Sequence, residues 1–172
     1  MLIVMSGLPG TGKTALAKGL ARQLKAAHVR IDRIEQALRD DESPSEDIGS
    51  AGYLLGYALA EDNLRLGQTV VADSVNPLSI TRDAWRAVGG RAHVPVVEVE
   101  IVCSDKEEHR RRIETKKADI PGPDVPSWKD IEARHYEPWS RQRIVIDTAG
   151  KPYEQSLGEL DRKLNKVRAK QA

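Results

Sequence analysis

Eight residues near the start of the chain constrain its fold more than any other segment, and they read Gly7-Leu8-Pro9-Gly10-Thr11-Gly12-Lys13-Thr14. They match the pattern G-x-x-x-x-G-K-[ST], which forms a phosphate-binding loop when a strand precedes it and a helix follows it. Both conditions are met, because residues 2–5 are an apolar run and leucines recur at helical spacing after residue 13. A chance match in a glycine-rich turn would lack this context.

The residue types of this loop suit the phosphates of a nucleotide for separate reasons. Glycine lets successive backbone N–H groups face a phosphate without an intervening side chain, and the following helix adds its positive dipole end. Lys13 is expected to reach the β- and γ-phosphates, and the Thr14 hydroxyl to bind Mg²⁺. We therefore predict that the loop and the next residue, Ala15, bind ATP, or alternatively GTP, together with Mg²⁺.

The rest of the chain alternates between short apolar runs and stretches of helical period. The runs are 2–5, 28–31, 69–72, 94–103 and 144–146, and the helical stretches are 13–26, 33–39, 51–66, 79–88, 106–117, 127–134 and 153–169. The runs are rich in Val and Ile without polar alternation, which is typical of strands covered on both faces. The pattern predicts an α/β fold with βαβ units and a mainly parallel sheet. Segments 40–50 and 119–126 are expected to be irregular.

Composition narrows the classes of protein that remain. A chain of 172 residues can form one compact domain, which we expect to span residues 1–172. The net charge of +1 argues against a protein dedicated to nucleic acid or to an anionic membrane surface. A single cysteine excludes a disulfide framework, and His28, His93 and His135 have no carboxylate at ligand spacing in the sequence, so a structural metal site is not expected. With no membrane span or leader segment recognised, the cytoplasm is the expected location.

Two aspartates end predicted strands at the edge of the sheet that also carries the phosphate loop. Asp32 follows the second strand and Asp73 follows the third. Ligands of parallel sheets bind beyond the carboxyl ends of the strands. One carboxylate there can orient or deprotonate an acceptor hydroxyl, and the other can hold water around Mg²⁺. The alternatives are structural: Asp32 as a helix N-cap and Asp73 as a strand terminator.

A basic helix and an aromatic cluster follow the fourth strand. The segment 109–112 reads His-Arg-Arg-Arg, and two lysines come one turn later, at 116 and 117. Cations on a helix leading into a proline-rich segment suit a lid that neutralises a transferring phosphate, although a solvated helix face is the alternative. Trp128, Arg134 and Trp139 lie nearby in sequence and could stack on an acceptor ring, or could form a small core that anchors the lid.

The sequence resembles the compact P-loop kinases. The resemblance is carried by the phosphate loop, by segments 30–37 and 73–77, and by the later segments 103–105, 109–112, 119–122 and 136–139. That group includes adenylylsulfate, gluconate and shikimate kinases, chloramphenicol phosphotransferase, zeta toxins and polynucleotide kinases. More narrowly, the chain is similar to a bacterial set described as AAA-like ATPases or adenylylsulfate kinase-like proteins. The likeness extends from residue 2 to about residue 150.

The resemblance implies a three-layer P-loop NTPase fold, with helices on both faces of a five-stranded parallel sheet and a lid at about residues 110–140. It implies that Lys13, Asp32, Arg110 and Arg112 are catalytic, and that Arg112 and Thr148 also contact the nucleotide. Thr14 and Asp73 would hold the metal. The expected acceptor-binding residues are Asp32, Glu35, Asp73, Asn76, Trp128, Arg134 and Trp139.

The predicted function is transfer of the ATP γ-phosphate to a hydroxyl of a small molecule. Several relatives have an arginine three residues after the second-strand aspartate, where this chain has Glu35. An acidic residue there disfavours a polyanionic acceptor, so a polyol, a nucleoside or an amino-bearing metabolite is expected. The alternatives are a polynucleotide or RNA-end kinase and a regulatory nucleotide-binding protein without an acceptor. Either a monomer or a homodimer is expected.

Overall fold

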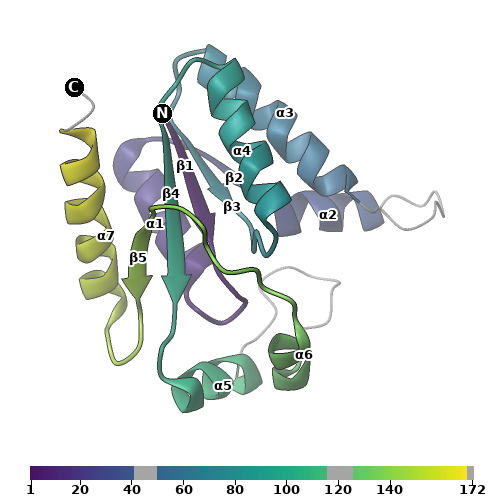
Figure 1. Cartoon of the computed structure of the whole chain (residues 1–172), viewed down its shortest axis with the longest axis vertical. Helices are drawn as coiled ribbons and strands as arrows, with labels where there is room; N and C mark the ends of the chain where they lie inside the picture. Colours follow the sequence, from purple (N-terminus) through teal and green to yellow (C-terminus); the bar gives the residue numbers. More distant parts are fainter. Residues whose placement is uncertain (41–49, 116–125, 170–172) are drawn as a thin grey trace.

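The computed structural model describes residues 1–40, 50–115 and 126–169. Helices and strands alternate along this part of the chain (Figure 1). Their bounds are β1 (Leu2–Ser6), α1 (Lys13–Leu24), β2 (Ala27–Arg30), α2 (Ile31–Arg39), α3 (Ala51–Arg65), β3 (Val70–Asp73), α4 (Ser79–Arg91), β4 (Val96–Val102), α5 (Lys106–Thr115), α6 (Trp128–Ala133), β5 (Ile144–Asp147) and α7 (Tyr153–Arg168).

The five strands form one parallel sheet in the order β2-β3-β1-β4-β5. The predicted α/β class and the parallel sheet are therefore confirmed. The pairing register aligns Asp73 with Met5 on one side and with Arg30 on the other. Asp73 thus lies at the carboxyl end of β3, between the strand that enters the phosphate loop and the strand that precedes Asp32.

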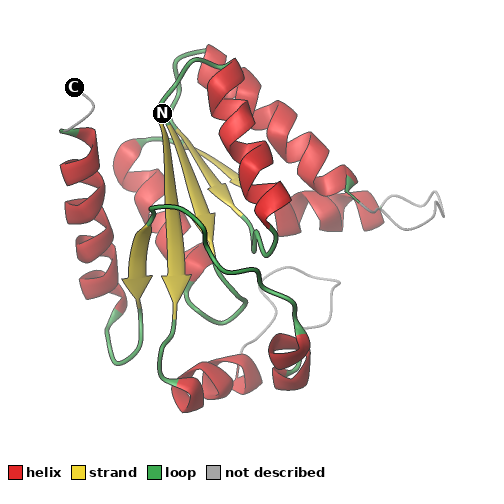
Figure 2. Cartoon of the chain, viewed as in Figure 1, coloured by secondary structure: helices red, strands yellow, loops and turns green. Residues whose placement is uncertain are grey.

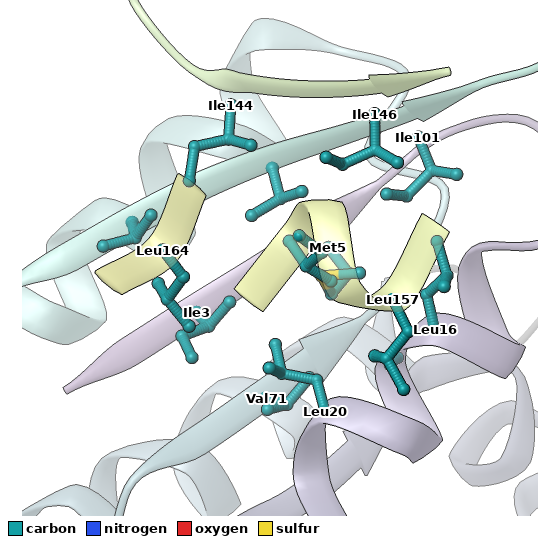
Figure 3. Close-up of a cluster of buried hydrophobic side chains, with 14 of the residues drawn as sticks. Ile3, Met5, Leu16, Leu20, Val71, Ile101, Ile144, Ile146, Leu157 and Leu164 are labelled. Carbon is teal, nitrogen blue, oxygen red and sulfur yellow. The ribbon is translucent and has the colours of Figure 1, made fainter. Parts of the chain in front are cut away.

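Helices cover both faces of the sheet (Figure 2). Alternate residues of β1 face opposite sides, so Ile3 and Met5 join one buried cluster while Leu2 and Val4 join the other. On the first face, Leu16 of α1 and residues of α7 pack over the strands (Figure 3). On the second face the cover comes from α3 and α4. The continuous apolar strands follow from this burial on both sides.

The predicted end of the second strand is wrong. Ile31 was expected to be its last residue but is the first residue of α2, and Arg30 is the last with extended backbone. Ile31 is buried and packs on α3, where a Cβ added at Gly56 would lie 2.3 Å from Ile31 Cδ1. The close approach of the two helices explains why a β-branched residue starts a helix here.

The carboxyl ends of all the strands meet at one edge, and α5 and α6 lie beyond that edge in the connection from β4 to β5 (Figure 1). The helix predicted for 106–117 ends at Thr115 in the described region. Most of the expected irregular segment 40–50, the two lysines at 116 and 117, and all but the last residue of 119–126 lie outside the described residues. Within the described residues, no helix is both long enough and apolar enough to cross a membrane.

Candidate active site

The phosphate loop joins β1 to α1 in a backbone conformation that requires glycine. Gly10 and Gly12 have φ angles of +82° and +89°. A Cβ at Gly10 would also lie 2.6 Å from Ile113 Cδ1 on α5. The entry to the loop is fixed by a 3.1 Å hydrogen bond from the Gly7 amide to the Val75 carbonyl, beyond the end of β3. The loop is therefore held between the sheet edge and α5.

The backbone amides of this loop are available to an anion. Among the described residues, no acceptor takes the amide hydrogens of Gly10, Gly12, Lys13 or Thr14. Lys13 and Thr14 begin α1, so their amides also lie at the positive end of the helix dipole. Converging unpaired donors at a helix N-terminus fit the phosphates of a nucleotide.

Asp73 is contacted by three side chains, those of Lys13, Thr14 and His28. The Lys13 amine donates to Asp73 Oδ1, and the Thr14 hydroxyl lies 3.4 Å from the same oxygen. Asp73 is completely buried and Lys13 nearly so. Burial raises the pKa of Asp73, but the Lys13 charge and the hydrogen bonds from His28 and Lys13 outweigh it and hold the pKa well below the ordinary value. An ionised carboxylate beside a hydroxyl is an oxygen donor set that fits Mg²⁺.

His28 is a member of this group that the sequence did not reveal. Its Nε2 atom lies 3.3 Å from Asp73 Oδ2, although the two residues are 45 positions apart. His28 has no carboxylate at ligand spacing in the sequence, yet the fold brings the Asp73 carboxylate to it. Because β2 and β3 are adjacent and parallel, residues 28 and 73 come together only through strand pairing, which no local sequence spacing encodes.

The residues predicted to bind the acceptor begin on α2 with two carboxylates. Asp32 lies in the first turn of α2, with its side chain 44% exposed and 3.6 Å from the Arg30 guanidinium. It is not the N-cap, because Arg30 takes that position. Glu35 follows one turn later, where burial and the Asp32 charge raise its pKa despite the opposing charges of Arg39 and Arg134. Arg134, an exposed residue, thus approaches the predicted acceptor region.

Tyr53 of α3 is a second residue that sequence reasoning missed. Burial raises the pKa of its hydroxyl to about 12, against the smaller opposing effects of the nearby Asn76 backbone and Ser74 side chain. The charges of Glu35 and Asp32 also act on it. Tyr53 therefore adds a neutral hydroxyl beside the two carboxylates.

Asn76 was expected to contact the acceptor, but the structure places it in the interior. Its side chain is completely buried, and it has a φ angle of +49°. The amide nitrogen donates to the Ser6 hydroxyl, while the amide oxygen accepts from Ser74 and from the Trp85 indole. With its polar atoms bonded within the protein, Asn76 connects the end of β1 to the loop after β3. We assign it a structural role.

Trp139 was also expected to contact the acceptor, but it lies against Arg82 instead. Its ring stacks on the buried Arg82 guanidinium, 4.2 Å away, and Tyr136 lies on the same guanidinium at 4.9 Å. Arg82 also donates to the carbonyls of Asn76, Pro77, Glu137 and Pro138. This contact network, which we call the Arg82 anchor, fixes the segment after α6 to α4. Trp139 serves as part of the anchor, which agrees with the structural alternative for the aromatic cluster.

The helix α5 packs directly on the phosphate loop. His109 is buried, and its Nε2 atom lies 2.8 Å from the Pro9 carbonyl oxygen. Trp128 of α6 meets the His109 ring edge-on at 5.2 Å, so both helices support the loop. His109 is therefore a packing residue and not part of an exposed basic face.

The two lid arginines have different surroundings. Arg112 donates to the hydroxyl and the carbonyl of Thr148, and the Thr148 hydroxyl lies 2.9 Å from the Thr11 carbonyl. Arg112 thus reaches the phosphate loop through one intermediate residue. Arg110 is half-exposed and paired with Glu114, and it lines a cavity of about 740 Å³ between α5 and α6 that Trp128 also lines. In this structure, Arg112 is therefore the one of these two arginines that is bonded to a residue contacting the phosphate loop.

The comparisons with known proteins agree with this arrangement. The model of a family described as AAA domain matches residues 2–138. No curated protein matches the chain.

Solved structures show the same fold at low sequence identity. A candidate kinase from Chloroflexus aurantiacus is 21% identical over 94% of this chain and 96% of that chain, with a TM-score of 0.74. Kti12 from Chaetomium thermophilum in complex with ADP-AlF3 is 19% identical over 96% and 98%, with a TM-score of 0.69. The adenylylsulfate (APS) kinase CysC of Mycobacterium tuberculosis with AMPPNP and APS is 20% identical over 93% and 95%, with a TM-score of 0.66.

These similarities confirm the three-layer P-loop NTPase fold and the resemblance to the P-loop kinases. Because the family model spans most of the sequence, the assignment does not depend on the phosphate loop alone. The chain belongs to the AAA domain family of P-loop proteins.

Proposed function

We propose that the protein is an ATP-dependent kinase, with GTP as the alternative donor, that phosphorylates a hydroxyl of a small molecule. The observation that carries this proposal is the convergence of Lys13 and Thr14 on Asp73, beside loop amides at Gly10, Gly12, Lys13 and Thr14 that have no acceptor among the described residues. Such a site suits the triphosphate of a nucleotide.

The phosphate loop would hold the donor. The amides of Gly10, Gly12, Lys13 and Thr14 and the Lys13 amine would bind the phosphates, and Arg112 with Thr148 would border the nucleotide. Thr14 and Asp73 would hold Mg²⁺, which supplies charge neutralisation on the phosphate oxygens. Arg110 is proposed to approach the transferring group from α5.

Asp32 would act on the acceptor. In the proposed transfer, the acceptor oxygen forms a bond to the γ-phosphorus and the bond to the β–γ bridging oxygen breaks, which releases ADP. The hydroxyl proton passes to the Asp32 carboxylate. The 44% exposure of that side chain leaves it accessible from the cleft, as this role requires.

The charges around Asp32 support a neutral or amino-bearing acceptor. Glu35 and Asp32 are one turn apart, and Tyr53 adds a hydroxyl close to both. Two carboxylates repel a phosphorylated or sulfated acceptor, whereas an ammonium group or a polyol can bind to them. Arg134 and Trp128 are proposed to border the same region from α6 and the residue that follows it.

An ATP-consumption screen tests the proposal. The purified protein with Mg²⁺ would be incubated with polyols, nucleosides, aminoglycosides, adenylylsulfate and a short oligonucleotide bearing a 5′-hydroxyl. Stimulation by a neutral or amino-bearing small molecule, lost in Asp32→Asn, is the expected result. Stimulation by adenylylsulfate alone would contradict the acceptor class, and stimulation by the oligonucleotide alone would favour an end kinase. Nucleotide binding without stimulation by any acceptor would favour a regulatory protein.

A further inference from the structure

The two oxygens of the Asp73 carboxylate have separate partners. Oδ1 faces the phosphate loop, where it contacts the Lys13 amine and the Thr14 hydroxyl. Oδ2 faces β2, where His28 Nε2 lies 3.3 Å away. The carboxylate is therefore bonded from two sides, and its plane is fixed by groups on different elements.

The chemistry of the two groups decides which of them carries the hydrogen between His28 Nε2 and Asp73 Oδ2. An ionised carboxylate only accepts hydrogen bonds, so the Nε2 atom of His28 must carry the hydrogen. The His28 side chain is 20% exposed while that of Asp73 has no exposure, so Oδ2 is bonded by a protein side chain and does not face solvent. His28 is thus a hydrogen-bond donor to a buried carboxylate.

Lys13 has two competing partners. It neutralises Asp73 in this structure, and under the proposed function it also serves the phosphates of the nucleotide. A buried carboxylate that loses its cation is strongly disfavoured unless other donors hold it. His28 is a donor that this exchange leaves in place.

We infer that His28 is a positioning residue, which keeps the Asp73 carboxylate oriented while Lys13 engages the nucleotide, so that Oδ1 stays aligned with Thr14 for Mg²⁺. The inference rests on the proposed nucleotide site and adds a residue of β2 to it. Hydrogen bonds to a metal-ligating carboxylate orient its oxygens, and the loss of such an outer partner weakens metal affinity.

Two amide substitutions separate this role from simple packing. A glutamine at position 28 carries its nitrogen as far from the backbone as His28 Nε2, and can donate to Asp73 Oδ2. An asparagine is one methylene shorter and cannot reach that oxygen. Both are neutral and polar, so His28→Gln and His28→Asn differ mainly in whether the hydrogen bond survives.

The test is calorimetric titration of ATP into each protein, once with Mg²⁺ and once with a chelator. We expect Mg²⁺ to strengthen ATP binding in the unaltered protein and in His28→Gln by similar factors. In His28→Asn the Mg²⁺-dependent gain should fall by roughly 10-fold or more, while binding in chelator changes much less. If His28→Asn does not fold, as judged by circular dichroism, His28→Thr provides a still shorter side chain that is suited to a strand and also cannot reach Oδ2.

An equal Mg²⁺-dependent gain in the short variant and the unaltered protein would overturn the role of His28 and leave the proposed function intact. If the unaltered protein itself showed no Mg²⁺-dependent ATP binding, the proposed function would fail, and the inference with it. The two failures are therefore distinguishable in one set of titrations.

Discussion

The Lys13 amine and the Asp73 carboxylate form an ion pair in the interior, where 6% and 0% of their side chains are exposed. The pair joins the first helical residue of the phosphate loop to the end of the neighbouring strand β3. It places a flexible cation beside the position expected for nucleotide phosphates. The Lys13–Asp73 ion pair therefore stabilises the fold, and the same lysine can also bind a ligand.

Removing one partner of this pair should destabilise the protein without nucleotide. Lys13→Met leaves a buried carboxylate without its cation, and we expect a loss of about 3 kcal/mol in the free energy of unfolding. Lys13→Met combined with Asp73→Asn should recover much of the loss, because no uncompensated charge remains. Urea denaturation of the single and double variants provides the measurement. A single variant as stable as the unaltered protein would show that the pair contributes nothing.

Asp32→Asn should reduce turnover while leaving ATP binding intact. The amide can still accept a hydrogen bond but cannot take the acceptor proton, so kcat should fall by roughly 10²- to 10⁴-fold. The KM for ATP should change by less than about threefold, because Asp32 is proposed to act on the acceptor and not on the nucleotide. Asp62→Asn, an exposed carboxylate on α3, is the matched control. Full activity of Asp32→Asn would remove this residue from the mechanism.

Glu35→Gln should stabilise the protein at pH 7 while weakening the binding of an amino-bearing acceptor. Burial and the charge of Asp32 raise the pKa of Glu35 in the folded protein. The protonated side chain therefore contributes stability that is fully present below the ordinary pKa of about 4.3. That stability is lost as the pH rises through the folded-state pKa. At pH 7 the ionised side chain is therefore unfavourable, and the variant should melt at a higher temperature.

This difference in Tm should disappear near pH 4, where Glu35 is largely protonated and resembles the amide. The same variant should raise the KM of an amino-bearing acceptor. Thermal melts at the two pH values, followed by kinetics with the acceptor from the screen, make the check. A lower Tm for Glu35→Gln at pH 7 would contradict the direction of the shift.

Arg82→Lys should destabilise the segment after α6. The lysine keeps the charge but cannot supply the planar donors that bond four carbonyl groups and stack on Trp139. We expect a loss of about 2–3 kcal/mol from unpaired buried carbonyls. Arg86→Lys is the control, since that arginine is 53% exposed and bonds Glu98 at 3.3 Å. Equal urea midpoints for the two variants would argue against the Arg82 anchor.

Much of the fold could be predicted from the sequence because its strongest signals are local. The phosphate loop is contiguous, and strands buried on both faces appear as continuous Val- and Ile-rich runs. The boundary between β2 and α2 was predicted one residue late, because the apolar run continues through Ile31, which is helical and packs against Gly56 of α3.

The site was predicted less completely, because several of its contacts join distant positions. His28 meets Asp73 through strand pairing, and Tyr53 meets Ser74 through the packing of α3. Trp139 was misplaced because its partner, Arg82, lies 57 positions earlier and carries no local motif. Asn76 follows a strand end, as ligand-binding residues often do, but its side chain turns inward to Ser6.

Titration of ATP with Mg²⁺ into the purified protein tests the central claim most directly. The account predicts saturable one-to-one binding of a purine triphosphate that weakens when Mg²⁺ is chelated. Binding should be lost in Gly10→Val, where the side chain would meet Ile113 and the φ angle is +82°. If the folded, unaltered protein showed no heat of binding with either ATP or GTP in the presence of Mg²⁺, the assignment of this loop as a nucleotide site would be contradicted.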